Sequence, residues 1–176
     1  LWLACQGRGV LFEQRSIHSL AELNSFDRVI VAGGALSKRL PELAHFKITP
    51  IKGQLLEMAW SDTLPQLACP VASQSYLLMN PNKKTAIIGA TYERNFTDLE
   101  PDIELTIKEI IPKTQSFFPA VNRNMVIGCR SGVRASTPNH LPILEDLRNG
   151  RWLMAGMGSK GLLYHALYAE ELSAKI

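Results

Sequence analysis

The chain has 176 residues, of which 46% are hydrophobic and 20% are charged, and its formal net charge is +3 at pH 7. This composition can bury a substantial core and excludes global disorder, and so mild a charge gives no reason to expect a nucleic-acid surface. Three widely spaced cysteines without a C-x-x-C pair favour neither a zinc site nor a disulfide framework, and they indicate a reducing, cytoplasmic location.

The first residues predict short pieces of helix and strand. Residues 1–5 are expected to end a helix, and they contain neither an initiator Met nor a charged leader. We therefore expect a fragment of a longer protein, with no signal peptide and, because no apolar run approaches eighteen residues, no membrane span. Residues 10–14 predict a strand, and Ser19 with Glu22 has the capping-box spacing that begins a short helix.

A continuous apolar segment over residues 27–32 predicts a strand that is buried on both faces. It runs into Gly33 and Gly34, and a short helix is expected over residues 36–43. A buried strand that ends in glycines before a helix is where α/β folds place ligands.

From about residue 46 the pattern changes to longer strands joined by polar turns. The predicted elements are a strand over 47–60 with a bend at Gly53, a hairpin of 76–79 and 85–92, a helix from 100–102 to about 118, a strand over 124–129 and an apolar segment at 141–144. Together they predict a mostly antiparallel sheet with one covering helix.

The last thirty residues predict a strand over 151–155, a glycine turn over 156–161 and a helix over 162–176. The turn reads G-x-G-x-x-G, but too few residues follow it for a complete Rossmann unit. Its glycines still allow backbone to approach a ligand closely, and a helix N-terminus favours negative charge. We expect a contact with part of a cofactor; the alternative is a tight turn with no ligand.

Three side chains are candidates for chemistry. Arg134 is expected just after a strand, where its planar fork can bind a substrate carboxylate, although a solvated arginine is the ordinary alternative. Tyr76 and Tyr92 begin and end the hairpin and can aim their hydroxyls at one cleft, or be ordinary strand aromatics. His140 is expected to be structural, since no triad or metal-ligand spacing surrounds it. The lack of an acid–base set suits chemistry carried by a redox cofactor.

Five segments, in this order, resemble FAD-dependent amine oxidoreductases of the D-amino-acid oxidase superfamily, which includes glycine oxidase: residues 29–37, 51–54, 89–92, 132–142 and 156–161. Within the superfamily, residues 134–142 and 158–170 are most similar to the oxidase half of the bifunctional bacterial enzymes that make 5-methylaminomethyl-2-thiouridine in tRNA.

The resemblance implies an α+β fold with a substrate lobe of mostly antiparallel sheet and helices, and α/β pieces of an FAD-binding lobe at both chain ends. Residues 1–45 and 146–176 would belong to the FAD-binding lobe and residues 46–145 to the substrate lobe. The N-terminal dinucleotide-binding unit would be absent, so we expect this chain alone to retain little FAD.

The resemblance also implies the site residues. Arg134 would bind a substrate carboxylate with help from Tyr76, and Tyr92 completes the predicted catalytic set. The residues implied to contact FAD are glycines and the turn before the last helix, namely Gly33, Gly34, Gly53, Gly156, Gly158, Ser159, Lys160, Gly161 and Leu162. No metal is expected.

Two hypotheses about function follow. The first is that this is the C-terminal part of an oxidoreductase that transfers hydride to FAD from a carboxylate-bearing amine, which would be a small amino acid or a modified uridine of tRNA. The second is a non-catalytic remnant, or an isolated substrate-binding lobe that does not bind FAD by itself.

Overall fold

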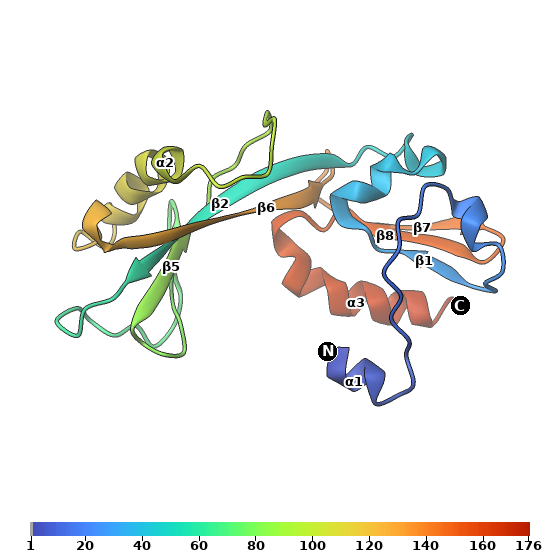
Figure 1. Ribbon diagram of the computed structural model, residues 1–176, viewed down its shortest axis with the longest axis horizontal. Helices are drawn as coiled ribbons and strands as arrows, with labels where there is room; N and C mark the ends of the chain where they lie inside the picture. Colours follow the sequence, from blue (N-terminus) through green and yellow to red (C-terminus); the bar gives the residue numbers. More distant parts are fainter. Residues whose placement is uncertain (1) are drawn as a thin grey trace.

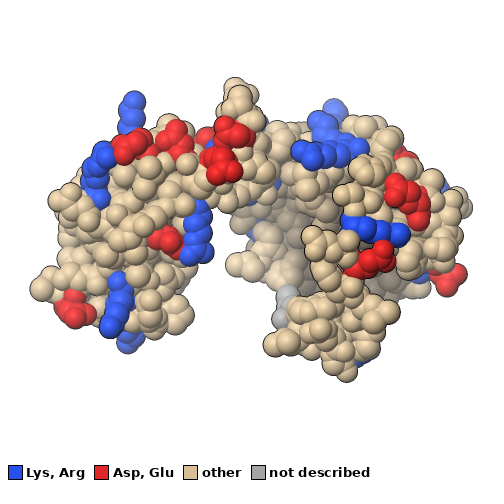
Figure 2. Space-filling model, viewed as in Figure 1, with Lys and Arg blue, Asp and Glu red and all other residues tan. Residues whose placement is uncertain are grey.

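A computed structural model describes residues 2–176 and contains two β-sheets, each with its own hydrophobic core. Two long strands, β2 (Thr49–Ala59) and β6 (Val126–Ser136), run from one lobe toward the other (Figure 1). On the face shown in Figure 2 a wide notch separates the two lobes, and acidic and basic side chains are mixed. The α+β fold class predicted from the sequence is confirmed.

The smaller sheet has the order β1-β8-β7, with β1 (Val29–Val31) parallel to β8 (Arg151–Ala155) and β7 (Ile143–Arg148) antiparallel to it. Leu153 of β8 and Leu43 are completely buried in the core of this lobe. Helix α3 (Gly161–Ser173) follows β8 and lies below the sheet in Figure 1. Segments from both ends of the chain therefore build this lobe.

The larger sheet is antiparallel, with the order β3-β4-β5-β2-β6. Its shorter strands are β3 (Val71–Ala72), β4 (Tyr76–Met79) and β5 (Thr85–Gly89). Helix α2 (Ile103–Gln115) covers it by packing Ile110 and Ile111 against buried residues of the sheet. The predicted hairpin is present, although its second strand ends at Gly89 and not at Tyr92, and the predicted covering helix is present.

The start of α2 is set by Asp102, whose side chain accepts a hydrogen bond from Leu105 N at 2.9 Å. Such an N-cap is worth about 1 kcal/mol because it satisfies a backbone donor that the helix leaves free. Ser19 caps the 3₁₀ helix Leu20–Leu23 (η1) in the same way, and the predicted capping box with Glu22 is formed.

Three expectations for the N-terminal segment were wrong. Residues 10–14 form no strand; Leu11 and Phe12 are largely exposed and pair with no neighbouring strand among the described residues. Strand β1 is not buried on both faces, since Ile30 is 45% exposed. The helix expected over 36–43 is divided into two 3₁₀ helices, Gly34–Arg39 (η2) and Pro41–Leu43 (η3), because Pro41 lacks the N–H that a continuous helix needs.

Strand β6 is longer than expected and continues through Ser136, so Arg134 lies inside a strand rather than after one. The long antiparallel partner β2 explains the difference, because it pairs with β6 from Thr49 to Met58. The remaining elements are α1 (Trp2–Gln6) and the 3₁₀ helices Arg123–Met125 (η4) and Gly158–Lys160 (η5). Leu1 of the predicted first helix lies outside the described residues.

Between residues 2 and 176 no helix is long and apolar enough to cross a bilayer. In the same part of the chain, His, Cys, Asp and Glu residues form no group of three or more that could hold a metal ion.

Candidate functional site

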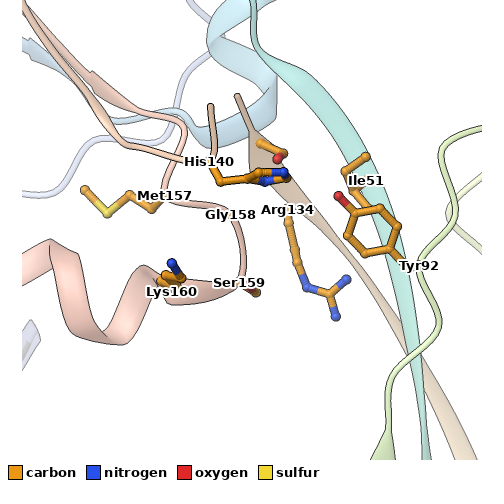
Figure 3. Close-up of a pocket in the computed structure, with 9 residues that line it drawn as sticks. Ile51, Tyr92, Arg134, His140, Met157, Gly158, Ser159 and Lys160 are labelled. Carbon is orange, nitrogen blue, oxygen red and sulfur yellow. The ribbon is translucent and has the colours of Figure 1, made fainter. Parts of the chain in front are cut away.

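A cavity of about 380 Å³ lies where β2 and β6 meet the turn before α3, and we call it the Arg134 pocket (Figure 3). Nine residues from both lobes line it: Ile51, Tyr92, Arg134, Ser136, His140, Met157, Gly158, Ser159 and Lys160. None of them is acidic, whereas Arg134 and Lys160 carry positive charge. The pocket therefore suits an anionic group.

Arg134 is placed by the pairing of β6 with β2, where it lies opposite Ile51. Its half-buried side chain crosses to Gly53, and a Cβ built on Gly53 would be 2.6 Å from the guanidinium carbon of Arg134. Nη1 makes a long contact of 3.5 Å with the carbonyl oxygen of Thr91. No Asp or Glu of the described chain forms an ion pair with Arg134. A guanidinium in this state can receive a carboxylate in the pocket.

The two tyrosines of the predicted catalytic set lie in different places. Tyr92 lines the Arg134 pocket and turns its hydroxyl toward it (Figure 3), while its ring has the Arg94 guanidinium 5.5 Å from its centroid. Tyr76 does not line the pocket: it pairs with Gly89 across β4 and β5, and its hydroxyl would be 3.0 Å from a Cβ at Gly89. The hairpin therefore does not bring Tyr76 and Tyr92 to this pocket together.

The glycine turn before α3 contributes one wall of the pocket. Gly156 and Gly158 both have positive φ, +75° and +56°, which glycine adopts without strain. A Cβ on Gly156 would lie 2.5 Å from Cγ2 of Thr137, so this glycine is required by packing. A Cβ on Gly158 would meet only Ser136 Oγ, at 4.0 Å. Gly158 therefore leaves open space beside the pocket.

Lys160 and Leu162, at the end of this turn and the start of α3, are both exposed. Lys160 is exposed at the edge of the pocket, with Nζ 5.9 Å from the ring centroid of Tyr164 on the first turn of α3. Leu162, on the same turn, is 93% exposed. The N-terminus of the 13-residue helix α3, at Gly161, faces the same region and carries partial positive charge.

The predicted glycines of the N-terminal segment lie away from the Arg134 pocket. Gly33 and Gly34 line a second cavity of about 510 Å³, and Gly33 also lines a third of about 570 Å³. Beside Gly33, the hydroxyl of Ser37 is buried and makes no hydrogen bond within the described chain. A Cβ on Gly33 would be 3.1 Å from it. Unpaired buried hydroxyls are rare and call for a partner.

Sequence reasoning missed several residues of the pocket. Ile51 and Ser136 were not expected there, and His140 was expected to be structural although it lines the pocket. His140 has a φ of +57° in the turn after β6. Reading β6 through to Ser136 and pairing it with β2 would have brought Ser136 and Ile51 to the same place as Arg134.

The fold is similar to that of two solved oxidases. Glycine oxidase from Geobacillus kaustophilus superposes with a TM-score of 0.71 over 83% of this chain and 40% of its own, at 22% identity. Iminodiacetate oxidase from Chelativorans sp. BNC1 gives a TM-score of 0.67 over 82% of this chain and 41% of its own, at 20% identity. Both comparisons show that this chain shares its fold with these oxidases.

Residues 1–175 match the family of FAD dependent oxidoreductases abbreviated DAO, and the chain belongs to this family. A curated relative is the tRNA 5-methylaminomethyl-2-thiouridine biosynthesis bifunctional protein MnmC of Polaromonas naphthalenivorans, 29% identical over 88% of this chain and 27% of its own length. MnmC of Vibrio vulnificus is 22% identical over 93% of this chain and 29% of its own. The chain thus spans less than a third of these relatives.

The residues present fit the cofactor of this family at two places. Gly158 offers an open backbone of positive φ next to the N-terminus of α3, which suits close approach of an electron-rich ring edge. The unpaired Ser37 hydroxyl beside Gly33 suits a polar group of a bound ligand. Gly53 differs from both, since the space above it is filled by Arg134.

Proposed function

We propose that this chain is the C-terminal part of an FAD-dependent oxidoreductase that oxidises an amine bearing a carboxylate. Membership of the family supports FAD as cofactor. The substrate class is inferred from one observation about Arg134. Its guanidinium has no ion-pair partner in the described chain and lines a pocket without acidic groups.

In this proposal Arg134 binds the substrate carboxylate through its two Nη groups, because a planar fork matches two carboxylate oxygens. Tyr92 adds a hydroxyl on the β2 side of the pocket (Figure 3). A carboxylate held at two points fixes the direction of the neighbouring carbon, and such orientation accounts for a large part of enzymatic rate enhancement. In this proposal Tyr76 supports strand β5 and does not contact the substrate.

The turn over residues 156–161 is proposed to contact the flavin ring. FAD, when bound, supplies the acceptor for the hydride that leaves the amine carbon. Open backbone at Gly158, the N-terminus of α3 and the ammonium of Lys160 all place positive potential on this wall of the pocket. Residues of this chain would therefore stabilise negative charge where it develops.

Two sources of the amine are compatible with the pocket. Iminodiacetate oxidase and glycine oxidase, which share the fold, support a small amino acid by the substrates in their names. The names of the curated relatives support instead a modified uridine in tRNA. In both cases the amine would carry a carboxylate next to the carbon that is oxidised, and Arg134 would have the same role.

The proposal is tested with the complete flavoprotein that carries this chain. Flavin bleaching is followed without oxygen after addition of glycine or N-methylglycine, and of methylamine or dimethylamine, which lack the carboxylate. A tRNA bearing carboxymethylaminomethyluridine is the third substrate, with the unmodified tRNA as control. We expect bleaching by at least one carboxylated amine and little by its counterpart. A protein that binds no FAD, or whose flavin no carboxylated amine bleaches, would support the remnant hypothesis.

A further inference from the structure

A buried polar cluster lies beside the Arg134 pocket and consists of Gln54, Thr91 and Glu93. Gln54 and Thr91 are completely buried, and Glu93 is half-buried. A single oxygen of Glu93, Oε1, accepts hydrogen bonds from Gln54 Nε2 at 2.9 Å and from Thr91 Oγ1 at 2.5 Å. Thr91 Oγ1 also accepts from the backbone N–H of Gln54 at 2.9 Å, so its own proton is directed to Glu93.

The cluster fastens the chain on both sides of Tyr92. On one side, Thr91 N donates to the Gln54 carbonyl at 3.0 Å. On the other side, Glu93 and Lys52 exchange two backbone hydrogen bonds of 2.9 and 3.0 Å. Tyr92 lies between these two anchors and turns its hydroxyl toward the pocket (Figure 3). Its position is thus set by residues that do not line the pocket themselves.

The same segment also provides a backbone contact for the Arg134 side chain. The carbonyl oxygen of Thr91 is 3.5 Å from Nη1 of Arg134. Any shift of Thr91 therefore moves an acceptor that faces the guanidinium. Arg134 and Tyr92 both depend on where residues 91–93 lie.

Gln54 joins the cluster to the core of its lobe. Its Oε1 accepts a hydrogen bond of 2.6 Å from the backbone N–H of Asp102, the residue that caps α2. A satisfied buried network of this kind holds one geometry, because every alternative leaves a polar group without a partner. The α2 end of the lobe is in this way connected to the pocket.

We propose that Glu93, through its hydrogen bonds with Thr91 and Gln54, is a positioning residue of the Arg134 pocket. These hydrogen bonds fix residues 91–93 and thereby set the Tyr92 ring and the Thr91 carbonyl that faces Arg134. The kinetic consequence rests on the proposed function, since it concerns binding of a carboxylated amine. The geometric consequence, a fixed Tyr92, does not rest on it.

The test uses the complete protein with 3-fluorotyrosine placed at position 92, and compares four variants by fluorine NMR and by steady-state kinetics. Glu93→Ala removes the shared acceptor, and Thr91→Val removes the hydroxyl while it keeps the shape, which provides a second variant should Glu93→Ala not fold. Glu93→Gln keeps an acceptor oxygen. Glu100→Ala is the matched control, because it removes an exposed carboxylate from the segment between Glu93 and α2. The Glu100 side chain makes no hydrogen bond in the described chain.

We expect Glu93→Ala and Thr91→Val to shift or broaden the fluorine signal and to raise KM for the carboxylated amine by about ten- to a hundredfold, with a smaller change in kcat. Glu93→Gln and Glu100→Ala should remain close to wild type. An unchanged fluorine signal in both Glu93→Ala and Thr91→Val would overturn the positioning role. A shifted signal in a protein that does not favour carboxylated amines would support the positioning role and contradict the proposed function instead.

Discussion

The guanidinium of Arg134 occupies the space above Gly53 that a side chain at that position would fill. A Cβ on Gly53 would lie 2.5 Å from Nη2 and 2.6 Å from Cζ of Arg134. Gly53 pairs in register with Gly132 of β6, two residues before Arg134, so the arginine lies diagonally across the two strands. The absence of a side chain at Gly53 thus decides where the positive charge of the pocket sits.

The first prediction compares these two paired glycines. Gly53→Ala should displace the Arg134 guanidinium and weaken binding of a carboxylated amine by about ten- to a hundredfold, which corresponds to the 1.5–3 kcal/mol of a hydrogen bond to a charged group. Gly132→Ala is the matched control, because a Cβ there meets nothing within 4 Å. Titration of both variants with N-methylglycine measures the difference. Equal affinities in the two variants would show that Gly53 does not place Arg134.

This relationship also marks how far the sequence alone could lead. The glycine turn over 156–161 and the capping box at Ser19 were predicted because their signals are local. The contact between Gly53 and Arg134 depends on the register of two strands about eighty residues apart in sequence, which no local pattern determines. Gly53 was therefore assigned to the cofactor on resemblance alone, whereas in the structure its neighbour is Arg134.

The tyrosines illustrate the same point. Tyr76 and Tyr92 were grouped because they begin and end one predicted hairpin. In the structure β5 ends at Gly89, and Tyr92 follows it in a segment that pairs with residues 52–54 of β2. Because this segment pairs with β2, Tyr92 lies at the pocket, whereas Tyr76 lies beside Gly89. The end of a strand depends on long-range hydrogen bonds, which the local sequence pattern does not reveal.

The second prediction separates two glycines of the turn. Gly156→Ala combines a positive φ with a contact of 2.5 Å to Thr137, so we expect a loss of about 2–5 kcal/mol in unfolding free energy. Gly158→Ala meets only the positive φ and should cost about 1–2 kcal/mol. Relative to its loss of unfolding free energy, however, Gly158→Ala should lose more bound FAD than Gly156→Ala. Denaturant unfolding and the flavin-to-protein ratio, both measured on the complete flavoprotein, report the two effects. A normal flavin content in Gly158→Ala would argue against close approach of a cofactor there.

The third prediction concerns the charge of Lys160. If this ammonium acts on the flavin, Lys160→Met should lower the midpoint potential of bound FAD, because a nearby positive charge favours the more negative, reduced form. Lys175→Met is the control: it removes the same charge beyond the other end of α3, where Lys175 pairs with Glu171 at 2.5 Å. Potentiometric titration compares the two. Equal potentials would place Lys160 among ordinary surface lysines.

The fourth prediction is a pH effect at Glu42. Its pKa is lowered, first by the hydrogen bond from the Ser19 hydroxyl at 2.6 Å and also by the Leu20 N–H at 2.9 Å. Because the folded-state pKa lies below the unfolded one, this stabilisation is complete above the unfolded pKa and is lost as pH falls through the folded pKa. The unfolding free energy, measured at a series of acidic pH values, should therefore decrease less steeply with falling pH in Glu42→Gln than in the wild type. Parallel curves for the variant and the wild type would show that Glu42 does not contribute to the loss of stability at acidic pH.

Whether Arg134 binds the substrate carboxylate is decided by kcat/KM of Arg134 variants in the complete flavoprotein, measured for a carboxylated amine and for the same amine without its carboxylate. Arg134→Ala should cost roughly 2–5 kcal/mol of transition-state binding for the carboxylated amine and far less for its counterpart. Arg134→Lys should recover only part, since an ammonium cannot reproduce the fork. Equal kcat/KM for wild type and Arg134→Ala on the carboxylated amine would contradict the assignment of Arg134 as the carboxylate-binding residue.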